Sequence, residues 1–131
     1  MAQVSRSVAL RAAPEAVWSV IGGFQALPGW HPAVESSYRE DIDGVEHRRL
    51  GLKGGGEIVE RSLGGDAHSY GYAIVSGPLP VADYVSTLTV APAGSGSVVV
   101  WTSAFTPAAE GAEAVIAGVY EAGLAALAAR F

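Results

Sequence analysis

The C-terminal segment from Ala108 to Phe131 is the only long stretch of this chain with helical periodicity. A helix of this length extends roughly 35 Å, far enough to cross a small domain, so its apolar face needs a sheet to cover it. Alanine and glycine are frequent on that face, so either space remains between helix and sheet, or the sheet packs closely against good helix formers. The apolar residues recur at spacings of three and four: Val115, Ile116, Val119, Tyr120, Gly123, Leu124 and Leu127.

The composition predicts a single globular domain over residues 1–131, because 50% of the residues are hydrophobic and only 16% are charged. The net charge is −5 and the eight basic residues are scattered, which argues against nucleic acid and membrane-surface partners. We expect no membrane insertion and a cytoplasmic location, since neither a signal peptide nor a long apolar run is present. Without cysteine or paired histidines, we expect neither a metal nor a cofactor. A monomer and a homodimer are both compatible with this composition.

The rest of the chain reads as strands and turns with one helical interruption. Residues 13–21 predict a short helix, and residues 24–32 predict at most one more irregular turn because Pro28, Gly29 and Pro32 break longer helices. We therefore expect an α+β fold: a curved, seven-stranded antiparallel sheet around the long C-terminal helix, with two short helices between strands one and two. The expected strands are residues 4–10, 33–40, 45–50, 57–63, 68–75, 84–90 and 98–105.

Alternation along these strands assigns an unusual set of side chains to one face of the sheet. Aromatic residues and isolated polar groups are mixed there, as in ligand pockets, which are apolar with a few convergent polar groups. The alternative is a filled core in which the tyrosines and the tryptophan have satisfied hydrogen bonds. The inward-facing candidates are Ile58, Glu60, Tyr70, Tyr72, Ile74, Tyr84, Ser86, Trp101 and Ser103.

Glu60 is the strongest candidate for chemistry. An inward carboxylate costs several kcal/mol unless it is paired, hydrated or protonated, and burial raises its pKa toward that of a useful acid or base. The alternative is a salt bridge to the neighbouring strand. Alternation favours Arg48 as that partner, whereas a β-bulge would place Arg49 there instead.

The order of elements, together with specific residues, resembles the START-like or Bet v 1-like superfamily, and especially its bacterial polyketide cyclase/dehydrase-like branch. The residues are Trp18, Trp30-His31-Pro32, Glu60-Arg61, Tyr72, Tyr84 and Trp101. The resemblance covers the full chain and implies a helix-grip fold that holds a hydrophobic small molecule between the long helix and the sheet. It also implies an arginine and a tyrosine that hold substrate oxygens, for which Arg48, Tyr72 and Tyr84 are the candidates.

The same resemblance extends to two loops and to the end of the cavity. Residues 51–56, with Leu52, and residues 76–80, with Leu79, correspond in position to the gate and latch loops of plant hormone receptors in this superfamily. By the family's order, Val115, Val119 and Gly123 lie opposite Tyr72, Tyr84 and Trp101, so Gly123→Leu is expected to fill the cavity without unfolding the protein.

The segment Trp30-His31-Pro32 lies between the short helices and strand two. Trp30 either contacts ligand at the cavity mouth or plugs the end of the barrel. His31 is expected at the rim or in solvent, with no catalytic role. Glu35 follows on strand two and could project into the pocket.

Three functions are compatible with these observations. The first is binding of a small hydrophobic or aromatic molecule, polyketide- or lipid-like, with acid-base cyclase or dehydratase chemistry that would depend on Glu60 and Arg48. The second is a non-catalytic carrier or sensor of a hydrophobic ligand. The third is a structural or partner-binding module with a filled core.

Overall fold

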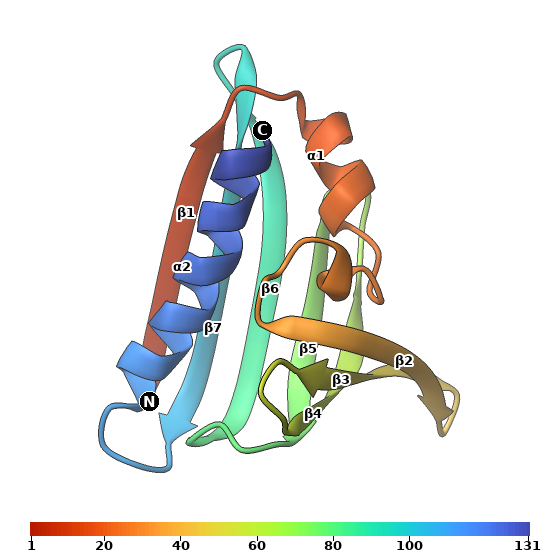
Figure 1. The fold of residues 1–131 in the computed structure, drawn as a ribbon, viewed down its shortest axis with the longest axis vertical. Coiled ribbons are helices and arrows are strands. Elements are labelled where there is room, and N and C mark those ends of the chain that lie inside the picture. The colour runs from red at the N-terminus through yellow and green to blue at the C-terminus, as the bar shows by residue number, and fades with distance from the viewer.

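A computed structural model describes residues 1–131 and shows one curved sheet that holds a long helix (Figure 1). In chain order the elements are β1 (Ala2–Leu10), α1 (Pro14–Ile21), the 3-10 turn η1 (Leu27–Gly29), β2 (Val34–Ile42), β3 (Val45–Leu52), β4 (Glu57–Gly65), β5 (Ser69–Ser76), β6 (Val81–Ala93), β7 (Gly96–Pro107) and α2 (Ala112–Arg130). The predicted α+β helix-grip architecture is confirmed. The second short helix is a single 3-10 turn, because Pro28 and Gly29 leave no room for a longer one.

All seven strands form one antiparallel sheet in the order β1-β7-β6-β5-β4-β3-β2. The first strand pairs with the last, and β2 forms the opposite edge, so α1 and η1 connect the two edges of the sheet. In Figure 1, α2 runs along β1 and β7, while β2, β3 and β4 curl toward the viewer around the other side. The concave face therefore receives side chains from α2, η1 and most strands.

Glycine sets the start of α2. Gly111 has φ of 83°, in the left-handed region that glycine adopts without a steric penalty, and the helix begins at Ala112. The predicted segment from Ala108 therefore begins four residues too early. The strands β6 and β7 are longer than predicted because their ladder continues to the pairs Val81–Pro107 and Ala93–Gly96.

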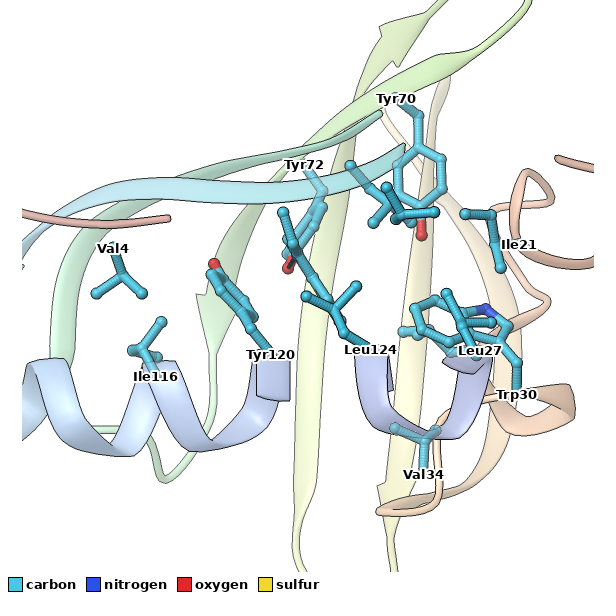
Figure 2. Packing of buried hydrophobic residues seen from close by; sticks show 14 of the residues in the cluster. Val4, Ile21, Leu27, Trp30, Val34, Tyr70, Tyr72, Ile116, Tyr120 and Leu124 are labelled. Atoms are coloured by element: carbon cyan, nitrogen blue, oxygen red, sulfur yellow. Dashed lines mark hydrogen bonds between the residues drawn. The ribbon is translucent and has the colours of Figure 1, made fainter. Parts of the chain in front are cut away.

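The buried face of α2 joins the concave face of the sheet in one hydrophobic core (Figure 2). Ile116, Tyr120, Leu124 and Leu127 are at most 4% exposed. Although α2 is long and apolar enough to cross a membrane by composition alone, here it is the core helix of the domain. The prediction that Val115 faces inward is wrong: it is 42% exposed, because the buried residues follow Ile116 at spacings of three and four and Val115 precedes that row.

Candidate functional site

A pocket of about 200 Å³ lies between α2, the concave face of the sheet and two loops. Fourteen of its 19 lining residues are hydrophobic, so its walls are mainly apolar. The β3–β4 loop and the β5–β6 loop both contribute to it. The lining residues are Leu27, His31, Ala33, Val34, Arg48, Leu50, Leu52, Lys53, Gly55, Ile58, Glu60, Tyr72, Ile74, Leu79, Tyr84, Trp101, Ile116, Val119 and Tyr120.

Arg48 and Glu60 form an ion pair inside this apolar wall. The two residues are directly opposite each other on β3 and β4, and Arg48 Nε donates to Glu60 Oε1 at 2.7 Å. The side chains are 0% and 6% exposed, respectively. Arg49 points to the outer surface and pairs there with Glu40 and Glu57. Regular alternation along β3 thus brings Arg48, and not Arg49, to the pocket.

One nitrogen of Arg48 has no hydrogen-bond partner. Nη1 donates to the Phe24 carbonyl at 2.9 Å and to the Tyr70 hydroxyl at 3.1 Å, whereas Nη2 is buried and unpaired. The guanidinium carbon lies 4.2 Å from the centre of the Phe24 ring and 4.7 Å from that of Tyr72, which places aromatic faces beside the cation. An unpaired buried N–H of a charged group is a strong donor for an oxygen in the pocket.

Burial raises the pKa of the Glu60 carboxyl above its ordinary value, and the attraction of the Arg48 guanidinium opposes that rise. Burial disfavours the Arg48 charge, but Tyr70 and Glu60 outweigh it and raise the pKa of Arg48 further above its already high value. The arginine is therefore cationic throughout the physiological range. The carboxyl group is the one whose protonation state the pocket can change.

Three tyrosines, Tyr72, Tyr84 and Tyr120, form a hydrogen-bonded wall beside this ion pair. The Tyr72 hydroxyl lies 3.1 Å from that of Tyr84, which in turn contacts the hydroxyl of Tyr120 on α2. Trp101 Nε1 donates to the Tyr72 hydroxyl at 3.1 Å, and the Trp101 ring stacks on Tyr120 with centroids 4.4 Å apart. Figure 2 shows Tyr72 reaching from the sheet and Tyr120 from the helix into the same space. Burial, as the largest cause, raises the pKa of Tyr72 and Tyr84 well above the ordinary value.

A β-bulge positions Tyr84 in this wall. The register of β6 against β7 shifts between Ala82 and Val85, so that Asp83 and Tyr84 together oppose Phe105. Asp83 takes the left-handed conformation, with φ of 52°. The bulge directs Tyr84 inward, where it is 3% exposed and its ring stacks on Phe105 at 5.9 Å.

The end of the pocket near η1 is closed by tight packing. His31 is 2% exposed, and its Nε2 donates to the Val119 carbonyl at 2.8 Å while its Nδ1 accepts from the Ala33 amide at 3.1 Å. These two bonds require the neutral ring with its proton on Nε2. Burial lowers the pKa of His31, although the bond to Val119 opposes that change. The expectation that His31 lies at the rim or in solvent is wrong, because α2 covers it.

Trp30 and Gly123 belong to the same closed end. The Trp30 and Trp101 rings lie 5.6 Å apart, and Trp30 is 6% exposed without lining the pocket. A Cβ atom at Gly123 would lie 2.7 Å from His31 Cδ2 and about as close to both tryptophans. The expectation that Gly123 borders free space is therefore wrong: the helix needs glycine here for close approach.

The other predicted residues fall into three groups. Ten line the pocket: Arg48, Leu52, Ile58, Glu60, Tyr72, Ile74, Leu79, Tyr84, Trp101 and Val119. Tyr70, Ser86 and Ser103 lie outside the pocket lining but are buried. Tyr70 forms a hydrogen bond with Arg48, and Ser86 forms one with Tyr120. The Oγ of Ser103 has no hydrogen-bond partner. Glu35 and Val115 are exposed, and Glu35 borders a separate surface depression beside Trp30.

Sequence reasoning missed Tyr120 as a site residue. It was recognised only as part of the apolar stripe, yet its hydroxyl connects α2 to the tyrosines of the sheet. A polar atom in the middle of an otherwise apolar helical face was the available signal. No cluster of three or more His, Asp or Glu side chains is arranged to hold a metal ion.

The sequence matches the family described as polyketide cyclase/dehydrase and lipid transport over residues 1–131. No curated protein matches the chain. The solved structure of XoxI from Bacillus cereus is 36% identical, with a TM-score of 0.91, and the match covers 100% of this chain and 96% of that one. A Thermobifida fusca protein is 34% identical, with a TM-score of 0.87 and coverage of 99% and 93%.

A more distant structure, the Zhui aromatase/cyclase from a Streptomyces species, has a TM-score of 0.80 at 19% identity, with coverage of 98% and 92%. At that identity the likeness concerns the fold alone.

Proposed function

Because the chain belongs to the polyketide cyclase/dehydrase and lipid transport family, we propose that its pocket binds a small aromatic or otherwise compact hydrophobic molecule. The ligand carries an oxygen atom that accepts a hydrogen bond from Arg48. The apolar walls supply most of the affinity, and the arginine supplies the orientation.

The unpaired Nη2 of Arg48 is the observation that carries this proposal. It belongs to a cation that is fully buried and lines an apolar pocket. Leaving a buried donor unsatisfied costs about 1–3 kcal/mol, and more for a charged group. A ketone or carboxylate oxygen in the pocket would recover that free energy, whereas a pure hydrocarbon would not.

The size of the pocket favours a compact ligand. About 200 Å³ is below the range of roughly 300–1,000 Å³ typical of sites for drug-sized molecules. A mono- or bicyclic ring system suits this volume better than a long acyl chain does. Of the activities in the family's description, cyclase or dehydrase chemistry therefore fits this chain better than transport of a long-chain lipid.

Access would run between the two loops that border the pocket. Lys53 and Gly55 come from the β3–β4 loop, which Leu52 precedes at the end of β3, and Leu79 comes from the β5–β6 loop. Gly54, Gly55 and Gly56 all have positive φ, a conformation that few other residues adopt there at low cost. We infer that these loops are the entrance, in the places where the gate and latch of related proteins were expected.

The test is a comparison of acetophenone with ethylbenzene, which is similar in shape but lacks the oxygen. Binding is followed by calorimetry and by the intrinsic fluorescence of the three tryptophans, of which Trp101 lines the pocket. Acetophenone should bind the protein several-fold more tightly, as expected for one hydrogen bond to a charged donor. Failure of both probes to bind would overturn the proposal.

Two variants locate the site. The double variant Arg48→Met with Glu60→Met removes both charges without leaving one unpaired, and should abolish the preference for acetophenone. Arg49→Met is the matched control, since Arg49 lies on the same strand but faces outward. Val119→Phe should occupy the pocket and block both probes, while Val115→Phe, on the exposed face of the same helix, should not.

A second candidate function is acid-base catalysis, favoured by the position of Glu60 in the pocket with a pKa raised by burial. In the dehydration of a β-hydroxy ketone, Glu60 would remove a proton from the α-carbon, which joins the carbonyl to the carbon that bears the hydroxyl. Arg48 Nη2 would stabilise the enolate oxygen. As the double bond forms, Glu60 would return the proton to the departing hydroxyl, which leaves as water. Glu60→Gln should then abolish turnover and preserve binding; unchanged turnover would exclude this role.

A further inference from the structure

Five hydrogen bonds form one continuous series through the hydroxyls of the tyrosine wall. The groups at the two ends of the series determine which atom donates in each bond. At one end, Trp101 Nε1 can only donate, and it donates to the Tyr72 hydroxyl at 3.1 Å. At the other end, the Thr102 carbonyl can only accept, and Ser86 Oγ donates to it at 2.9 Å. Between these ends, the three tyrosine hydroxyls and Ser86 are linked in series.

The orientation of every proton in the series follows from those ends. Since the Ser86 proton goes to Thr102, the bond between Tyr120 and Ser86 uses the proton of Tyr120. The bond between Tyr84 and Tyr120 must then use the proton of Tyr84. By the same reasoning, Tyr72 donates to Tyr84. Each hydroxyl has one proton, so none remains to point into the pocket.

The tyrosine hydroxyl oxygens can still accept hydrogen bonds from a ligand. A hydroxyl oxygen has two lone pairs, and Tyr72 and Tyr84 each use one of them within the series. Both rings line the pocket. Because burial keeps the pKa of both phenols well above the ordinary value, the series keeps all its protons at physiological pH.

We propose that the tyrosine wall accepts hydrogen bonds from the ligand and does not donate them, so that the pocket selects aromatic ketones that also carry a hydroxyl or amino donor. This inference rests on the proposed function, in which Arg48 binds the ketone oxygen. Ser86 lies outside the pocket lining, and it sets the selectivity by fixing the direction of the series.

A ligand that presents only acceptor atoms to the tyrosine wall faces the lone pairs of the tyrosine oxygens and forms no hydrogen bond with them. To receive a proton from Tyr72, it must break the bond between Tyr72 and Tyr84 or reverse the whole series against the Thr102 carbonyl. A donor on the ligand requires neither change. The expected preference is about fivefold, the ratio that corresponds to one net hydrogen bond.

Four para-substituted acetophenones test the proposal on the unmodified protein by calorimetry. The hydroxy and amino compounds carry a donor, the methoxy compound carries only an acceptor, and the methyl compound carries neither. We expect the hydroxy and amino compounds to bind about fivefold more tightly than the other two. Equal affinities, or tighter binding of the methoxy compound, would overturn the proposal.

Serine variants test whether the donor-to-acceptor order of the series causes the ligand preference. Ser103 pairs with Ser86 across β6 and β7, and its Oγ is buried without a partner, so it could replace Ser86 as an acceptor. Replacing both by alanine leaves Tyr120 without an acceptor at that end, so the series can reverse and release the Tyr72 proton into the pocket. The preference for hydroxy over methoxy should then disappear. Ser103→Ala alone, the control, should keep it.

The possible failures are distinguishable. If all four ketones bind equally well and the Arg48→Met, Glu60→Met variant weakens them all, the proposed function holds and the donor selectivity is wrong. If no ketone binds, the proposed function itself fails. A retained preference in the folded double serine variant would show that Ser86 does not set the direction. If that variant does not fold, the four ketones on the unmodified protein decide the selectivity.

Discussion

Gly123 of α2 packs directly against His31, which precedes β2. A methyl group added at Gly123 would lie 2.7 Å from His31 Cδ2, closer than carbon atoms approach without displacement. The imidazole cannot withdraw easily, because its two nitrogens bond to Val119 and Ala33. This contact joins the middle of the long helix to the end of the pocket.

Gly123→Ala is therefore expected to destabilise the protein by about 1–3 kcal/mol, as overpacking of a core does. Gly118 is the matched control, because it lies on the same helix with nothing within 4 Å of the added methyl group. Gly118→Ala should stabilise the protein by up to about 1 kcal/mol, since alanine favours the helix. Urea unfolding measures both. A neutral Gly123→Ala variant would mean that the packing around His31 adapts.

Arg48 and Glu60 should show strong coupling in a double-mutant cycle. Arg48→Met alone leaves a buried carboxylate without its partner and should lower the free energy of unfolding by about 3–5 kcal/mol. Replacing both residues by methionine should cost far less, because no charge is left unpaired. Additive effects in urea unfolding would contradict the ion pair.

Asp83 should tolerate glycine but not isoleucine. Its φ of 52° is unfavourable for a β-branched side chain, and a change there would disturb the bulge that directs Tyr84. We expect Asp83→Ile to destabilise the protein by about 1–2 kcal/mol relative to Asp83→Gly. The melting temperatures of the two variants give the comparison. Equal stability would mean that the bulge relaxes without cost.

Protonation of His31 should destabilise the fold in mild acid. Burial lowers the pKa of His31 below its ordinary value of 6.5, so the unfolded chain binds this proton more readily than the folded one. Stability should therefore decrease as the pH falls below about 6.5, toward the folded pKa. The additional proton on Nδ1 would also break the bond from the Ala33 amide.

The measurement is the free energy of unfolding between about pH 7.5 and about pH 5.5. His31→Gln should show a smaller decrease over that interval than the unmodified protein. His68→Gln is the control for the substitution itself, because the His68 side chain is partly exposed and lies outside the pocket lining. The same decrease in His31→Gln would assign the effect to other groups.

The period of two along the strands predicted most of the pocket wall. Tyr72, Tyr84 and Trp101 were assigned inward from alternation and line the pocket. Alternation also favoured Arg48 over Arg49 as the partner of Glu60, and the ion pair has that arrangement. These positions could be predicted because each strand constrains its own side chains locally.

Positions where two distant segments meet could not be predicted in this way. Val115 and Gly123 were assigned to the pocket from the helical stripe together with the order of elements in the resembling family, but the rotation and depth of α2 depend on what packs against it. His31 lacked any local sign of burial, since its partners Val119 and Ala33 become neighbours only when the helix docks on the sheet.

The sequence by itself determined the seven strands, the long helix and the strand residues that face inward, because backbone periodicity and turn chemistry act over a few residues. The tertiary structure decided which inward residues border free space and which pack tightly. It also decided the direction of the hydrogen bonds from Trp101 to Thr102, since this series joins side chains from three strands and a helix. Such relationships depend on the distance between surfaces, which no local pattern of residues specifies.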